Sequence, residues 1–228
     1  MSRTLNVVRM QLINRQTYLW VPLIVLGGSL VITMLIWAML PPGSEKYSGG
    51  AQAPLWYFGV VGVQALTLTF PFSQAMSVTR REFALGTFLT AALTAGILSA
   101  IFVVGGLIEQ ATVGWGMNGY FFFLDWIWQA GPLGAALFYF VVAMLFFVVG
   151  FWAATIYKRF GATWLTITLV GVGLVLVGLM WLTGRLNAWA SVFAWFAGQG
   201  STGLALWGVL LVAVLAVSAF ATLRRAVP

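Results

Sequence analysis

Six uninterrupted apolar runs, each about 20 residues long, constrain the fold of this chain more than any other feature. An α-helix needs roughly 20 residues to cross about 30 Å of hydrocarbon, because it rises 1.5 Å per residue. The sequence therefore predicts an all-α, polytopic membrane protein with six transmembrane helices. The predicted spans are Leu19–Leu40, Leu55–Ser77, Phe83–Ile108, Pro132–Tyr157, Ala162–Leu182 and Gly203–Leu223.

The composition excludes an ordinary soluble domain. The chain is 62% hydrophobic and only 7% charged, whereas soluble domains carry about 25% charged residues. We predict a cytoplasmic or interfacial N-terminal helix over 1–18, a transmembrane domain over 19–223 and a cytoplasmic tail over 224–228. A frayed leader is the alternative for 1–18, because its apolar face is untidy. The first run is too long for a signal-peptide core, so we expect it to be retained.

The positions of the basic residues predict the orientation in the membrane. Nine of the 11 lysines and arginines fall on one side of the six-span layout: Arg3, Arg9, Arg15, Arg80, Arg81, Lys158, Arg159, Arg224 and Arg225. Lys46 and Arg185 fall on the other side. Basic loops stay in the cytoplasm, so both termini and two very short loops are predicted to be cytoplasmic. The longer loops, with any re-entrant or surface helices, are predicted to lie outside.

Several kinds of chemistry are missing from the sequence. It has no cysteine and no histidine, so it offers no thiolate or imidazole metal site and no catalysis by these groups. Neither lysine stands in a G-K-[ST] phosphate loop. The net charge is +7, but the basic residues stand at span ends rather than on one face, which argues against nucleic-acid binding. We therefore predict no enzyme activity, no metal and no cofactor on this chain.

Small and polar residues stand at helical spacing within the spans. In the second span they are Gln64, Thr67, Pro71 and Gln74, spaced 3, 4 and 3, which predicts a single helical face. Such a stripe either bonds neighbouring helices or forms one wall of a polar cavity. Small residues recur at helical spacing in the third span (Ala92, Gly96, Ala100), and one face of the fifth span, which includes two glycines, carries Trp164, Thr168, Gly171, Val175 and Gly178. This spacing predicts close helix packing for these two spans.

The predicted external loops are aromatic, notably in Gly114–Trp128 and Leu186–Gly200. Rings of this kind commonly form the belt at headgroup depth. Alternatively, Leu186–Gly200 forms short re-entrant or surface helices that close the outer mouth of a pathway. The candidate gate residues are Trp189, Phe193, Trp195 and Phe196.

Thr79-Arg-Arg-Glu82 matches the [ST]-x-x-[DE] capping box ahead of an apolar run. It predicts that the third helix begins here. Arg80 and Arg81 are also what the orientation rule requires. A second interpretation is that this segment is a binding surface for a cytoplasmic partner. Its charged residues would set the register of the interface, and Phe83 would provide an aromatic anchor.

Three stretches carry a resemblance to a known family: SVTRREFALGTFLTAAL, GWGMNGYFFFLDW and YKRFG. They resemble bacterial ABC transporter permeases of the type-2 export class, specifically small six-span half-transporters. The resemblance implies a homodimer or closely related heterodimer in the bacterial cytoplasmic (inner) membrane. It also implies two copies of a separate ABC ATPase, which bind the ATP and Mg.

The resemblance also implies roles for particular residues. The ATPase-coupling residues are Thr79, Arg80, Arg81, Glu82 and Phe83, and a secondary cytoplasmic contact is formed by Lys158 and Arg159. The substrate path is lined by Gln64, Thr67, Pro71, Gln74, Thr168 and Gly171. The expected function is export of a hydrophobic or amphipathic substrate.

Two other functions remain open. One is a non-transporting membrane scaffold or immunity protein that binds a ligand through its external aromatic loops. The other is a secondary carrier, which the lack of a charged residue at mid-membrane disfavours.

Overall fold

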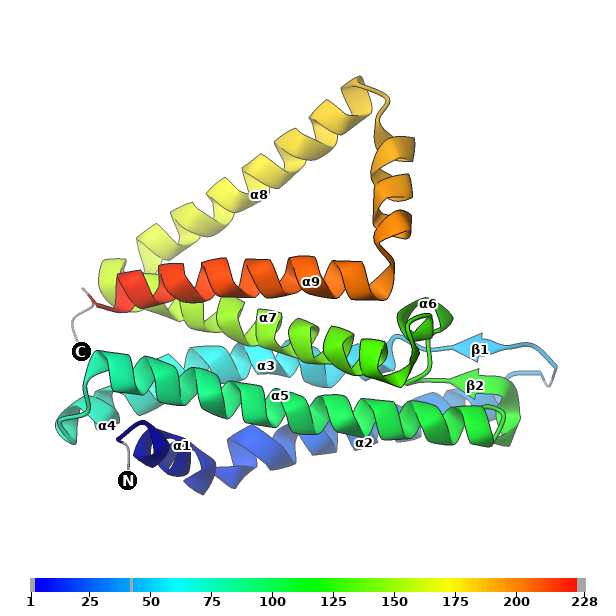
Figure 1. Cartoon of the computed structure of the whole chain (residues 1–228), viewed down its shortest axis with the longest axis horizontal. Helices are drawn as coiled ribbons and strands as arrows, with labels where there is room; N and C mark the ends of the chain where they lie inside the picture. The colour runs from blue at the N-terminus through cyan, green and yellow to red at the C-terminus, as the bar shows by residue number, and fades with distance from the viewer. Residues whose placement is uncertain (1–2, 42, 225–228) are drawn as a thin grey trace.

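The computed structural model describes residues 3–41 and 43–224 of the chain. Figure 1 shows a helical bundle with a short β-ladder at one end. In chain order the elements are α1 (Arg3–Ile13), η1 (Gln16–Trp20), α2 (Val21–Met39), β1 (Lys46–Tyr47), η2 (Gly50–Gln52), α3 (Ala53–Gln64), η3 (Ala65–Thr69), α4 (Phe70–Ala75), α5 (Arg80–Ala111), η4 (Gly114–Asn118), β2 (Gly119–Tyr120), α6 (Asp125–Trp128), α7 (Gly131–Phe160), α8 (Ala162–Arg185) and α9 (Trp189–Leu223).

Six helices among the described residues are long and apolar enough to cross a membrane, which confirms the predicted all-α, six-span fold. They run over Gln16–Met39, Gly50–Ala75, Arg80–Ala111, Gly131–Phe160, Ala162–Arg185 and Trp189–Leu223. Each contains most or all of one predicted span. The sixth differs most, because residues 189–199 are also helical and Gly200 then breaks the helix.

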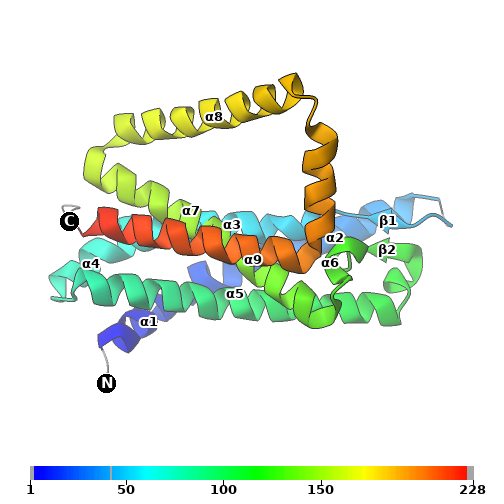
Figure 2. The ribbon, with the colours of Figure 1, turned by 45° about the horizontal axis from the view of Figure 1, so that its top comes forward.

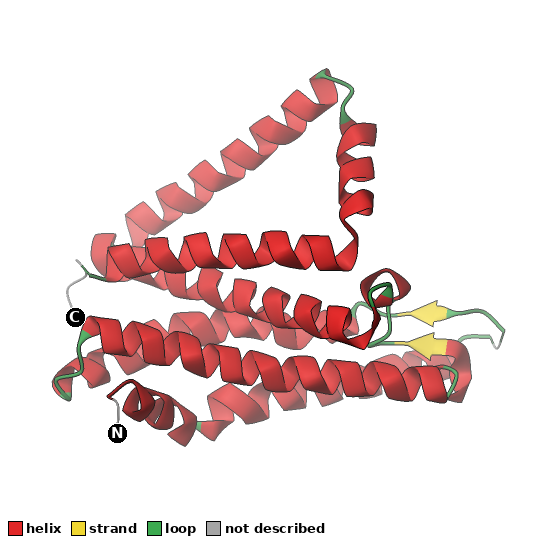
Figure 3. Cartoon of the chain, in the orientation of Figure 1, coloured by secondary structure: helices red, strands yellow, loops and turns green. Residues whose placement is uncertain are grey.

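The bundle has two distinct ends. α1, the α4–α5 turn, the α7–α8 turn and the end of α9 lie at one end, which we call the terminal end (Figure 1). The opposite end carries β1, β2 and α6 within residues 43–52 and 112–130, which we call the cap (Figure 3). This arrangement agrees with the predicted placement of both termini on one side. Residues 225–228 of the predicted tail lie outside the described residues.

The N-terminal segment is helical over Arg3–Ile13 rather than frayed. α1 packs on α5 and buries Val7, Val8 and Gln11. The Gln11 side-chain Nε2 donates a hydrogen bond of 2.8 Å to Thr87 Oγ1. A Cβ atom at Gly86 would run into the Val7 side chain, so glycine is what allows α1 to approach α5 this closely.

α3 and α7 cross with their backbones in direct contact. A Cβ atom on Gly150 would overlap the carbonyl of Gly59, and one on Gly62 would overlap the carbonyl of Phe147. Small residues allow helix backbones to approach in this way, and in a membrane such packing supplies much of the attraction between helices. This crossing holds the centre of the bundle together.

The sequence predicted this kind of close packing for the third and fifth spans, and the described chain shows it for the third span at Gly86 rather than at Gly96, while it leaves the predicted face of the fifth span open. A Cβ atom at Gly96 of α5, or at Gly171 of α8, would meet no described atom within 4 Å. Small residues at helical spacing are common in membrane helices, so the spacing alone did not identify which helices meet.

We expect Gly150→Ala to lower the free energy of unfolding by about 1–3 kcal/mol, because the added methyl forces α3 and α7 apart. Gly171→Ala is the matched control, since it makes the same change on an open helix face. There we expect no loss, or a gain of up to about 1 kcal/mol from better helix propensity. Unfolding of the purified protein in detergent, followed by tryptophan fluorescence, measures both. Equal effects at the two positions would contradict the observed crossing.

α8 stands apart from the rest of the bundle. It leaves α7 at Gly161, where φ is +86°, and residues 189–199 lead the chain back to the remainder of α9 (Figure 2). None of its residues is buried by the described chain. The surface of a helix that is apolar on all sides must be shielded from water, and in a membrane it is in contact with lipid or with another protein.

Candidate functional site

The α4–α5 turn at the terminal end contains the predicted capping box. Glu82 N donates to Thr79 Oγ1 at 3.3 Å, and Thr79 N donates to Glu82 Oε2 at 3.0 Å. The Thr79 hydroxyl also donates to Glu82 Oε2 at 2.7 Å. The prediction that the third helix begins here is confirmed, because Thr79 is the N-cap and α5 starts at Arg80.

Arg80 is engaged by its own chain. Its Nη1 donates to the carbonyl oxygens of Leu223, at 3.3 Å, and Arg224, at 2.6 Å. These carbonyls belong to the end of α9, where a helix has unsatisfied acceptors and a partial negative charge. Arg80 therefore ties the start of α5 to the end of α9.

The two neighbouring positions differ sharply in exposure. Arg81 is exposed on the first turn of α5. Phe83, by contrast, is completely buried, and its ring lies 5.1 Å from that of Phe70. The expectation that Phe83 presents an aromatic anchor to a partner is therefore corrected: the ring belongs to the core, because the chain reverses at 76–79 and brings α4 against α5.

Arginines surround the end of α9. One hollow is lined by Arg80, Arg81, Phe220 and Arg224, and a second by Arg159, Ala221, Thr222 and Arg224. Arg159 also lies over the Phe160 ring, with its guanidinium carbon 4.5 Å from the ring centre. The predicted coupling residues and the predicted secondary contact, Lys158 with Arg159, thus lie at the same end of the bundle (Figure 1).

The polar stripe of the second span does not form a single helical face. The π turn η3 separates Gln64 from Pro71 and rotates the later residues by about 100° relative to an unbroken α-helix. Thr67 Oγ1 donates to Val63 O at 3.0 Å, and Gln74 Nε2 donates to Val78 O at 3.0 Å. Both bonds are local, so these side chains do not join neighbouring helices in the described structure.

The stretch Leu186–Gly200 contains a short helix outside the bundle, as one of the two sequence interpretations predicts. Residues 189–199 are helical, and Gly200, with φ +61°, turns the chain into the final span. The four candidate gate residues form ring contacts but remain partly exposed: Trp189 stacks on Phe193 at 5.9 Å, and Trp195 lies 5.0 Å from Phe196. Thr168 and Gly171 of the predicted path lie on the uncovered helix α8.

Sequence reasoning missed Glu109 of α5, the side chain that makes the most hydrogen bonds to the cap among the described residues. This carboxylate is fully buried at the end of α5. Its Oε1 accepts from Trp115 Nε1 at 2.8 Å and Phe121 N at 3.0 Å. Its Oε2 accepts from Phe122 N and Phe123 N, both at 2.8 Å. The signal in the sequence was an acid at the end of an apolar run.

Two further contacts involve the cap: one joins its two strands, and the other fastens it to the bundle. β1 and β2 pair in parallel, with Lys46 opposite Gly119. The Lys46 side chain is buried, and its Nζ donates to the carbonyl oxygen of Trp37 at 3.0 Å. That carbonyl lies in the last turn of α2, where a cation is favourable.

Tyr47 bridges the two halves of the cap. Its hydroxyl lies 3.0 Å from Glu45 Oε2 and 3.2 Å from Asp125 Oδ2, and donates toward both. The hydrogen bond to Glu45, followed by desolvation and the charge of Asp125, raises the pKa of Tyr47 to about 12. Because this pKa lies above the usual value of 10.0, the bridge is present at neutral pH and is lost only as the pH rises through about 12.

Comparison of the chain with models of known protein families, with curated proteins and with solved structures gives no match in any of the three. The firm conclusion from sequence and structure together is a multi-pass membrane protein with six candidate spans.

Proposed function

We propose that this chain is the transmembrane permease subunit of an ATP-driven ABC exporter in the bacterial cytoplasmic membrane. A separate ATPase, present in two copies, binds ATP and Mg and supplies the energy. The permease pairs with a second copy or a closely related chain. The substrate is a hydrophobic or amphipathic molecule that moves out of the cell.

The observation that carries this proposal is the geometry of the α4–α5 turn. A capping box fixes the first turn of α5, and Arg81 stands exposed on it. A rigid helix start with an exposed arginine suits docking to a soluble partner, because charged groups set the register of an interface. The lack of a phosphate loop on this chain means that ATP hydrolysis would have to come from such a partner.

The uncovered helix α8 supports the second part of the proposal. It is apolar on all sides and unburied by its own chain, so a second permease would have a large surface to cover. Residues 189–199 continue this surface at the cap end (Figure 2). If the protein is instead a non-transporting scaffold, the surface of α8 is in contact with lipid only.

The test is co-expression with the ATPase encoded by a neighbouring reading frame, recognised by its G-x-x-x-x-G-K-[ST] loop. We expect a complex of two permeases and two ATPases that hydrolyses ATP, whereas the permease purified alone has no ATPase activity. The control is the same complex with the phosphate-loop lysine of the ATPase changed to alanine. A stable monomer that binds no nucleotide-hydrolysing partner would contradict the proposal and favour the scaffold.

A further inference from the structure

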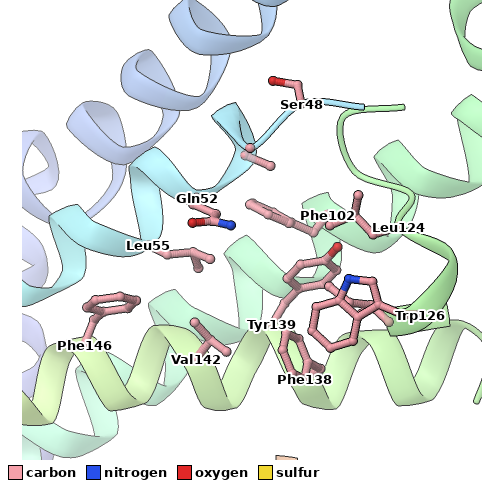
Figure 4. A pocket seen from close by; sticks show the side chains of 13 residues that line it. Ser48, Gln52, Leu55, Phe102, Leu124, Trp126, Phe138, Tyr139, Val142 and Phe146 are labelled. Carbon is pink, nitrogen blue, oxygen red and sulfur yellow. The ribbon is translucent and has the colours of Figure 1, made fainter. Parts of the chain in front are cut away.

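A partly open cavity of about 270 Å³ lies between α3, α5 and α7 next to the cap, with the exposed side chains of Gln52 and Trp126 in its lining. α3 and α7 touch at Gly59 and Gly150. Nearer the cap, the space between these helices is lined by Leu55 and Val142, and Phe102 of α5 closes its back (Figure 4). Leu124 and the helix α6 form its roof.

The lining decides what the cavity can hold. Its walls are aromatic and aliphatic, with the rings of Phe102, Phe138, Tyr139 and Phe146 facing the space (Figure 4). No charged side chain of the described residues lines it. An apolar cavity of about 150 Å³ is already large enough to bind benzene and stays dry without a ligand. This cavity is larger, so a neutral hydrocarbon group fits it and a charged group does not.

Ser48 and Gln52 are polar side chains that line the cavity near the cap, and the Tyr139 hydroxyl and the Trp126 indole N–H also belong to its lining. Ser48 Oγ accepts from Gly50 N at 3.0 Å and lies 3.3 Å from Thr33 Oγ1. Gln52 is exposed, and its amide is not hydrogen-bonded to the described residues. The Tyr139 hydroxyl already donates to Phe122 O at 2.7 Å. A ligand would therefore place its hydrocarbon among the rings and a neutral polar group beside Gln52.

We propose that this cavity is a binding site for a single alkyl chain, with the neutral polar group at the end of that chain (a hydroxyl, an amide or an ester) at Gln52. The chain could come from a bilayer phospholipid or from a free neutral amphiphile, because both present the same hydrocarbon. The site lies within one protomer, so it requires neither a second copy nor an ATPase. An experiment that rules out alkyl-chain binding in the cavity therefore does not contradict the proposed export function, and the reverse also holds.

The test uses two photoactivatable probes on the protein in lipid nanodiscs. One is decanol with a diazirine in mid-chain, and the other is phosphatidylcholine with the same group in one acyl chain. After illumination, we expect labelled peptides around Leu55 and Val142, with saturable labelling that unlabelled decanol displaces. The probe that labels these peptides identifies the source of the chain. Labelling by neither probe would overturn the proposal.

A pair of variants on α7 supplies the control. Val142→Trp fills part of the cavity, so less of the alkyl chain can be buried there. If about two methylene groups are displaced, we expect the affinity, and with it the labelling, to fall by about tenfold. Val149→Trp makes the same change on the same helix at a position that is 43% exposed and outside the cavity, so its labelling should match wild type. An equal fall in both variants would overturn the proposal. If Val142→Trp does not fold, displacement in the wild type decides, and labelling that does not saturate there also overturns it.

Discussion

Glu109→Ala should lower the free energy of unfolding by about 3–5 kcal/mol, because it removes a buried acceptor shared by four donors, two of them on buried and two on partly buried residues. The carboxylate binds three consecutive backbone N–H groups, of Phe121, Phe122 and Phe123, and the indole of Trp115. An alanine leaves these donors without a partner, and each unsatisfied buried donor costs about 1–3 kcal/mol. The total stays below the simple sum because the cap can open and let water reach some of them.

The same bonds hold a strained stretch of backbone. Val113 has φ +52° and Trp115 has φ +59°, a left-handed region that costs a β-branched or bulky residue about 1–3 kcal/mol. Without Glu109 this stretch has less to hold it in place. We therefore expect the damage in Glu109→Ala to begin in residues 112–123, before it affects the helices.

Glu109→Gln separates shape from charge. The amide keeps the size of the side chain. In the wild type each carboxylate oxygen accepts hydrogen bonds from two N–H donors, so in the variant the NH₂ group must face one of these two pairs of donors. We expect a loss of about 2–3 kcal/mol, smaller than in Glu109→Ala because two bonds survive. Thermal unfolding in detergent measures both variants, and hydrogen exchange at the amides of Phe121–Phe123 reports whether the cap opens first.

Asp125→Asn is the matched control for the loss of a carboxylate in the cap. Asp125 is at the start of α6, and its side chain accepts a hydrogen bond from the Tyr47 hydroxyl at 3.2 Å. Because this pair is exposed, we expect a change within about 0.5 kcal/mol. A loss at Asp125 as large as at Glu109 would show that general charge, rather than the buried network, stabilises the cap.

The features that the sequence predicted correctly are those set by local or one-dimensional physics. The thickness of a bilayer fixes the length of an apolar run, so the six spans followed from counting. The capping box at Thr79 and Glu82 involves residues three apart, so no tertiary knowledge was needed to predict it. The short helix at 189–199 was one of two interpretations, and periodicity alone did not choose between them.

Two of the features that the sequence did not predict depend on partners elsewhere in the chain, and a third is a local irregularity in a helix. Glu109 meets its backbone donors 12–14 residues later, after a loop whose path no pattern specifies. Phe83 is buried because Phe70 of the preceding span folds back against it. The π turn at Ala65–Thr69 covers only five residues, too few for hydrophobic periodicity to distinguish it from an α-helix. The last two cases explain why the predicted aromatic anchor and the single helical face of the polar stripe were wrong.

Arg81→Lys and Glu82→Gln should weaken coupling to an ATPase by roughly 2–5 kcal/mol if the α4–α5 turn docks on one, as the proposed function requires. Lysine keeps the charge that orients the span, but it loses the flat fork that binds a carboxylate or carbonyls through two bonds. Glutamine keeps an oxygen for the bonds from Thr79 and loses the charge, so the cap itself should change by well under about 1 kcal/mol. Protein amount and thermal stability should therefore remain close to wild type.

Arg80 is the wrong position for this test, because its guanidinium is already bound to the carbonyls of Leu223 and Arg224. A change there would loosen the end of α9 and mimic a coupling defect. Arg185→Lys is the better control, since it makes the same chemical change at the opposite end of the bundle, where the guanidinium lies 5.5 Å from the Trp181 ring centre. Export, substrate-stimulated ATP hydrolysis and retention of the ATPase should fall together in Arg81→Lys and Glu82→Gln but not in Arg185→Lys. Wild-type values for all three measurements would leave Arg81 and Glu82 as a topology signal and a helix cap, and the partner, if there is one, would have to bind elsewhere on the terminal end.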